Sequence, residues 1–109
     1  MNDKLNEPFL NPSTAEKYRR LGFVSADICM TLKIGNVSIS AVENPLSGVA
    51  LFFESAGNRT ACQYESCAPE KCGVEQIAGL IYINIATNFR DSAELFKAHF
   101  REVGIPLFQ

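Results

Sequence analysis

The chain has 109 residues, of which 47% are hydrophobic, with eight Phe, three Tyr and no Trp. This length fits one domain with a core that needs no metal or cross-link, because a chain of this size buries roughly two-thirds of its unfolded surface. Twelve acidic and ten basic residues give a net charge of −2. Nucleic-acid binders usually carry a clustered basic excess, so we expect no nucleic-acid partner.

Residues 1–12 are predicted to form a flexible leader, because Pro8 and Pro12 disfavour regular structure. Residues 13–109 then form a single α+β domain. The leader contains no apolar core of a secretory signal. The longest apolar run, residues 77–86, is about half the length that spans a bilayer. We therefore expect a cytoplasmic protein with no membrane partner.

Residues 13–22 are predicted to form a short helix. Ser13 and Glu16 have the spacing of a capping box, and Gly22 offers a left-handed stop. The apolar positions of this helix are Ala15, Tyr18 and Leu21. Its basic residues, Lys17, Arg19 and Arg20, are interpreted as a solvated face rather than as a phosphate site.

The middle of the chain has the pattern of an antiparallel meander. Apolar and polar residues alternate after residue 28, as in a half-buried strand. Gly35-Asn36 fits a two-residue hairpin loop, and Gly57-Asn58 marks a further turn. The strands predicted from these signals are residues 28–34, 37–41, 49–54 and 60–65.

Residues 66–79 admit two interpretations. They form either a short helix that contains Val74, Ile77 and Ala78 and ends at Gly79, or a structured loop. The run that follows, residues 80–86, is strongly apolar and is predicted to be a further strand.

The last predicted helix begins at Asp91-Ser92, a second capping arrangement, and ends at Gly104 and Pro106. Its predicted buried residues are Leu95, Phe96, Phe100 and Val103. The fold class is therefore predicted as α+β, an antiparallel meander of about five strands flanked by an N-terminal and a C-terminal helix.

Two predicted strands, residues 49–53 and 80–85, carry apolar side chains on both faces. A sheet with one solvated face would alternate cleanly, so a second face is expected to be covered. A barrel closure, the segment 66–79 or a second protein chain could provide this cover. The residues predicted to contact a partner chain are Ala50, Phe52, Ile81 and Ile83.

Four cysteines form the most unusual feature of the sequence. Cys62, Cys67 and Cys72 have a C-x4-C-x4-C spacing, and Cys29 lies on a predicted strand of the same sheet. Zinc sites usually show C-x2-C pairs, so this spacing permits a zinc site without indicating one. A redox-sensing disulfide between Cys67 and Cys72, or free buried thiols, are the other interpretations.

His99 is the only histidine, and it flanks the apolar stripe of the last helix. It could act as the base of a cysteine nucleophile, as the fourth ligand of a metal, or simply pack and form a hydrogen bond. No catalytic triad, phosphate-binding glycine loop or metalloprotease motif is present. We therefore predict no enzymatic activity and no cofactor other than a possible zinc ion.

Roughly residues 17–54 resemble part of a PilZ domain. The arginine pair of the first helix precedes a strand and a hairpin, and Gly48 matches the glycine of a D-x-S-x-x-G motif. Glu43 and Pro45 stand where that motif has Asp and Ser. PilZ domains bind cyclic di-GMP on a β-barrel, so the resemblance implies a degenerate nucleotide-binding barrel.

Three functions are compatible with these features. The first is a non-enzymatic domain that docks on another protein, or on a second copy of itself, as inhibitors, immunity proteins, chaperones and accessory proteins do. The second is a metal-binding or redox-sensing domain built on the cysteines. The third is the degenerate PilZ-like barrel.

Overall fold

The computed structural model describes residues 10, 12–27, 29–44, 48–55, 58–63 and 73–107, with the backbone alone at residues 44 and 58–63. The elements follow one another as α2 (Pro12–Arg20), β1 (Val24–Ser25), β2 (Met30–Ile34), β3 (Val37–Asn44), β4 (Gly48–Ser55), β5 (Asn58–Gln63), α3 (Val74–Asn88), the 3₁₀ turn η1 (Arg90–Ser92) and α4 (Ala93–Glu102).

The strands form one antiparallel sheet in the order β1-β2-β3-β4-β5, so every strand pairs with its neighbour in the sequence. The predicted hairpin at Gly35-Asn36 is confirmed, since Ile34 pairs with Val37 and Gly35 has a φ of 59°. A positive φ at the first loop residue suits glycine and matches the right-handed twist of the strands.

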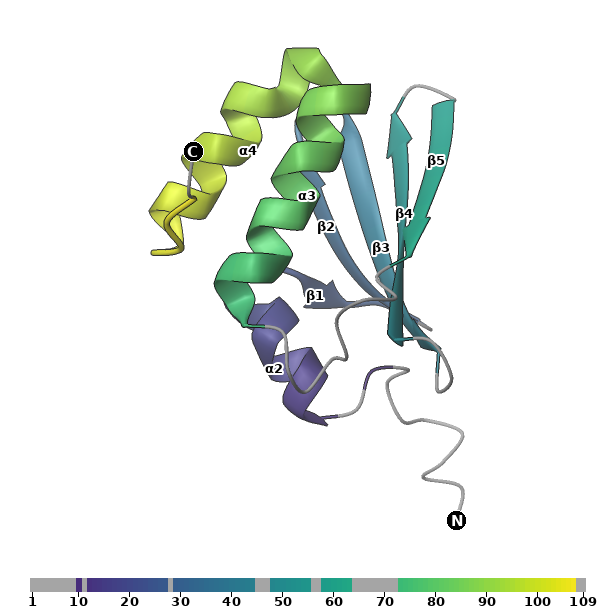
Figure 1. The fold of residues 1–109 in the computed structure, drawn as a ribbon. Helices are drawn as coiled ribbons and strands as arrows, with labels where there is room; N and C mark the ends of the chain where they lie inside the picture. Colours follow the sequence, from purple (N-terminus) through teal and green to yellow (C-terminus); the bar gives the residue numbers. More distant parts are fainter. Residues whose placement is uncertain are drawn as a thin grey trace.

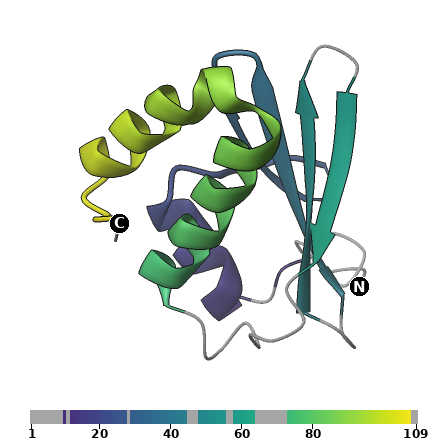
Figure 2. The same cartoon turned by 45° about the horizontal axis from the view of Figure 1, so that its top comes forward.

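The three α-helices of the described residues lie on the same side of the sheet (Figures 1 and 2). The side chains that β2, β3 and β4 direct toward the helices alternate along each strand and are buried: Met30, Leu32, Val37, Ile39, Ala41, Val49, Leu51 and Phe53. α3 and α4 meet them with Ile81, Ile85, Phe96 and Phe100, which are also buried. Full burial of one such side chain contributes about 1.5–3 kcal/mol, so this layer is the main source of stability.

The predicted strand at residues 80–86 is wrong, because these residues form the second half of helix α3. Ile77, Ala78, Ile81 and Ile85 are buried at a spacing of one helical turn, whereas Ile83 is exposed. A short apolar run fits a buried helix as well as a buried strand, so only its continuity with residues 74–79 decides between them. Gly79 therefore does not end the helix.

The ends of the domain also differ in detail from the predictions. Leu10, assigned to the flexible leader, is buried in the core, and Pro12 is the first residue of α2. In α4, Phe96 and Phe100 are buried as predicted, but Leu95 is 50% exposed, so it does not belong to the buried stripe. Gly104 has a φ of 84° and ends this helix as expected.

The α+β class and the antiparallel sheet are confirmed. The predicted strand count included residues 80–86, while the short strand β1 was not predicted. The terminal helices do not flank the sheet on two sides, since α2, α3 and α4 share one side (Figure 2). The described strands form an open sheet with β1 and β5 at its edges, so they do not show the barrel that the PilZ resemblance implies.

No helix in the described part of the chain is both long enough and apolar enough to cross a lipid bilayer.

Candidate functional site

The side of the sheet away from the helices is the candidate functional site, which we call the open face. The side chains of this face alternate with the buried ones along β1 to β4, and all are at least partly exposed: Val24, Thr31, Lys33, Ser38, Ser40, Val42, Ala50, Phe52 and Glu54. An antiparallel sheet with one solvated face normally carries polar residues there.

Two large apolar side chains interrupt this polar pattern. Val24 is 61% exposed and Phe52 is 40% exposed. They lie in one row across the sheet, because Val24 pairs with Thr31, Thr31 with Ser40, and Ser40 with Phe52. The residues between them are small, so neither apolar side chain is shielded by a bulky neighbour in its row.

Phe52 also belongs to a small apolar cluster. Val42 pairs with Ala50 across β3 and β4, and Ala50 and Phe52 follow each other on the same face of β4. Lys33 and Glu54 lie one row further along, separated by Ser38. The open face therefore combines an apolar centre with charged residues at its border, which is the usual composition of a protein-binding surface.

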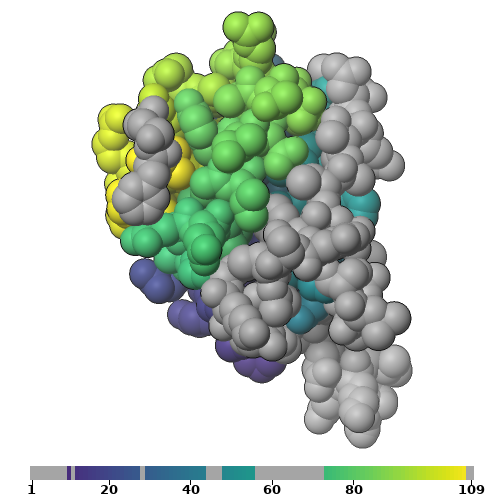
Figure 3. All heavy atoms as spheres, in the orientation of Figure 1, coloured from purple at the N-terminus to yellow at the C-terminus, as the bar shows by residue number. Residues whose placement is uncertain are grey.

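The four residues predicted to contact a partner do not share one surface. Ala50 and Phe52 lie on the open face, as expected for the outer side chains of β4. Ile81 is fully buried between α3 and the sheet, so no partner can reach it in this fold. Ile83 is 60% exposed on α3, whose outer side forms much of the surface in Figure 3.

Val24 was not predicted as part of any surface, because residues 23–27 have no periodic pattern. Its position depends on the two-residue pairing of β1 with β2. The sequence signal for strand β1 is a β-branched residue next to Phe23, and one such residue is too weak a signal to predict a strand.

The structure separates Cys29 from the other cysteines. Cys29 lies in the bend before β2 rather than in a strand, and its thiol is free. Its neighbour Met30 starts a row that continues through Ala41 and Leu51 to Cys62. Three strand spacings amount to roughly 14 Å. Two sulfurs on one zinc ion each lie about 2.3 Å from the metal, so Cys29 cannot complete a site with Cys62.

Cys67 and Cys72 lie outside the described residues, and of Cys62 the backbone position in β5 is described. A zinc site or disulfide among these three cysteines therefore stays a prediction. Within the described part of the chain, no group of three or more His, Cys, Asp or Glu side chains is arranged to hold a metal ion.

His99 connects α4 to the turn after α2. Its Nε2 donates a hydrogen bond to the carbonyl oxygen of Leu21 at 2.8 Å, and its ring meets that of Phe100 edge-on. The imidazole lies over Gly22, where a methyl group would come within 2.6 Å of Nε2. This geometry gives His99 a structural role, because its hydrogen bond and its packing hold α4 against the turn between α2 and β1.

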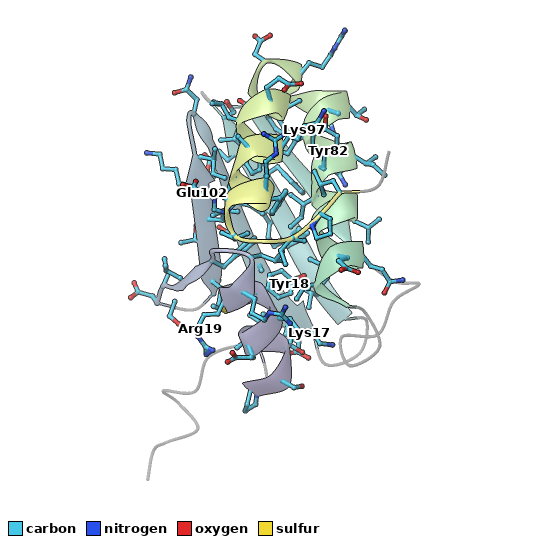
Figure 4. The ribbon with its side chains drawn as sticks, turned by 90° about the vertical axis from the view of Figure 1, so that its left-hand side faces the viewer. Lys17, Tyr18, Arg19, Tyr82, Lys97 and Glu102 are labelled. Carbon is cyan, nitrogen blue, oxygen red and sulfur yellow. The ribbon has the colours of Figure 1, made fainter. Side chains whose placement is uncertain are left out.

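The basic residues of α2 lie on its outer side, as predicted for a solvated face (Figure 4). Arg19 forms an ion pair of 3.2 Å with Glu16, one turn earlier in the helix. Such exposed pairs contribute little to stability. Arg20 is also exposed.

Tyr18 points from α2 into the core (Figure 4), where it meets the ring of Phe23 edge-on. Its hydroxyl is buried and has no hydrogen-bond partner among the described residues. Burial raises the pKa of Tyr18, and the negative charge of Glu43 raises it further. The hydroxyl is therefore neutral at any physiological pH, and it is no candidate for proton transfer.

Comparison with known proteins gives no relative for this chain: no family model, curated protein or solved structure matches it.

Proposed function

We propose that this domain is a non-enzymatic protein-binding module that docks on another protein through the open face of its sheet. The observation that carries the proposal is Phe52, an aromatic side chain of β4 exposed on a sheet face that the three described helices leave uncovered. Aromatic side chains surrounded by small residues are typical anchors of protein interfaces, where they enter a pocket of the partner.

The composition of the open face supports a protein as the ligand. Its hydroxyl groups on β2 and β3 can form hydrogen bonds with a partner, while Val24, Val42 and Phe52 supply apolar area. Lys33 and Glu54 at the border add one charge of each sign. A balanced charge favours a protein partner over a nucleic acid, which needs a basic surface.

The test is site-specific crosslinking in the native host. A photoreactive phenylalanine analogue at position 52 is expected to capture a defined protein, whereas the same analogue at position 83 captures none. Ile83 is the matched control, since it is an exposed apolar residue on the helical side of the molecule.

Purified domain and captured partner are then mixed, and their affinity is measured. Phe52→Ser is expected to weaken binding by about tenfold to a hundredfold, as for an interface anchor. Ile83→Ser leaves the affinity unchanged. Equal losses from both variants, or capture of the same proteins from both positions, would contradict the proposal. If the captured protein is a second copy of this chain, light scattering will show a dimer that Phe52→Ser dissociates.

A further inference from the structure

The second candidate site lies on the helical side of the molecule, where the chain turns back after α4 (Figure 1). A pocket of about 480 Å³ opens between α4 and the segment that follows it. Its lining consists of Lys97, Arg101, Gly104, Ile105, Pro106 and Leu107. Pockets that bind metabolite-sized ligands have volumes in this range.

The charge of the pocket is positive. Lys97 and Arg101 are one helical turn apart on α4, so both side chains reach the same pocket. None of the described lining residues is acidic. The described lining therefore favours a negatively charged ligand over a positively charged one.

Lys97 lies between an aromatic ring and a carboxylate. Its ammonium group lies 5.9 Å from the centre of the Tyr82 ring, and both side chains project into the space between α3 and α4 (Figure 4). The nearest carboxylate, that of Glu94, is 3.9 Å from Nζ and largely exposed. An exposed ion pair of this length is weak, so Lys97 can exchange it for a ligand.

The segment after α4 lines the same pocket with apolar residues and is joined to the helix end by backbone hydrogen bonds. Ile105 is buried, and its amide donates a hydrogen bond of 2.8 Å to the carbonyl oxygen of Phe100. Gly104 turns the chain with a positive φ, and its amide donates to the carbonyl oxygen of Arg101. These bonds also satisfy carbonyl groups at the end of α4. The negative end of the helix, equivalent to about half a charge, is opposed by the positive charges of Lys97 and Arg101.

We propose that this pocket binds a metabolite-sized organic anion, in which a carboxylate or phosphate group is joined to an apolar portion. The anionic group lies between Lys97 and Arg101, and the apolar portion lies against Ile105, Pro106 and Leu107. Charge-assisted hydrogen bonds to two cations provide the specificity, and the apolar wall adds contact area. This site is separate from the open face, so each proposal can fail without the other.

The experiment is a titration of the ¹⁵N-labelled full chain with three compounds that share a naphthalene ring: 1-naphthaleneacetate, 1-naphthyl phosphate and 1-naphthalenemethanol. We expect the two anions to shift the amide signals of Gly104, Ile105 and Leu107. We expect at least one of them to bind about tenfold more tightly than the neutral alcohol. The tighter of the two anions identifies the preferred head group.

The double variant Lys97→Gln/Arg101→Gln should remove the preference for anions. The control, Arg19→Gln/Arg20→Gln, removes the same charge from the exposed side of α2 and should retain the preference. The single variant Arg101→Gln provides a second measurement, because this residue is exposed and its loss leaves the fold intact. Equal affinity for the alcohol, anion-induced shifts confined to α2 or the sheet, or an unchanged preference in the double variant would each overturn the proposal. So would the absence of shifts with both anions.

Discussion

The two faces of the sheet are built from the same strands but differ in how far their side chains are buried. Phe52 and Phe53 are adjacent in β4, yet Phe53 is buried beneath the helices whereas Phe52 is exposed on the open face. The ring of Phe53 stacks on that of Phe89, with 6.3 Å between the ring centroids. Because the side-chain period of a strand is two, one residue of register separates the core from the surface. The inner face therefore determines stability, and the open face is available for recognition.

The largest effect is expected from the pair Phe53→Ala and Phe52→Ala. Phe53→Ala leaves a cavity in the core and should cost about 3–5 kcal/mol of unfolding free energy, since truncation of a buried Phe has that effect. Phe52→Ala should cost less than about 1 kcal/mol, as for surface substitutions. Urea denaturation measures both values. Similar losses from the two variants would show that the open face is covered as well.

The next effect concerns the contact between His99 of α4 and the turn that follows α2. Gly22→Ala places a methyl group 2.6 Å from the His99 ring at a φ of 104°. We expect a loss of about 1–3 kcal/mol, from both the clash and the backbone strain. In a His99→Ala background the clash is absent, so the same glycine substitution should cost less. A double-mutant cycle measured by thermal denaturation tests this, and strictly additive losses would refute the contact.

A smaller effect is expected at Tyr18, in the core beside the inner face. Its ordinary pKa is 10.0, and burial and Glu43 raise the pKa in the folded state. A raised pKa means that the unfolded chain loses the proton first. The contribution of Tyr18 is therefore fully present below pH 10 and decreases as the pH rises above that value.

At one pH unit above the ordinary pKa, this linkage amounts to about 1.4 kcal/mol. Tyr18→Phe removes the ionisable hydroxyl. Between pH 8 and pH 11 the wild type should therefore lose about 1.4 kcal/mol more unfolding free energy than the variant. Chemical denaturation at both pH values gives the comparison. A parallel decrease in the two proteins would mean that the hydroxyl ionises as readily in the folded state as in the unfolded chain.

The smallest expected effect is at Cys29, in the bend before β2. Cys29→Ser should change neither the zinc content nor the oxidation state of the remaining thiols, because about three strand spacings separate the two positions. Elemental analysis and mass spectrometry of anaerobically purified protein check both quantities. If zinc binds through Cys62, Cys67 and Cys72, serine at those positions will release it while serine at position 29 will not.

The elements that could be predicted from the sequence are those with local signals. The hairpin at Gly35-Asn36 requires a glycine with positive φ, and the ends of α2 and α4 have turn-forming glycines. The position of Phe52 on the second face of β4 followed from the alternation along this strand, whereas the apolar character of both faces predicted a cover that the described residues do not provide.

Other features could not be predicted, because tertiary contacts decide them. In α3, Ile81, Ile83 and Ile85 alternate as in a strand, and only packing against the sheet selects the helical spacing of Ile77, Ile81 and Ile85. Strand β1 is defined by its pairing with β2, and its two residues are too few to show an alternation of apolar and polar side chains. The pocket beside Lys97 depends on the path of the chain after Gly104, which the sequence does not specify.

The order of the strands has a consequence for synthesis on the ribosome. Each strand pairs with its neighbour in the sequence, so the whole meander can assemble once Gln63 has emerged. The helices that cover its apolar face, α3 and α4, emerge later. At elongation rates of about 5–20 residues per second, the nascent sheet exposes Leu32, Ile39 and Leu51 for a second or more. During this interval the inner face, rather than the open face, is the surface that a ribosome-associated chaperone would have to cover.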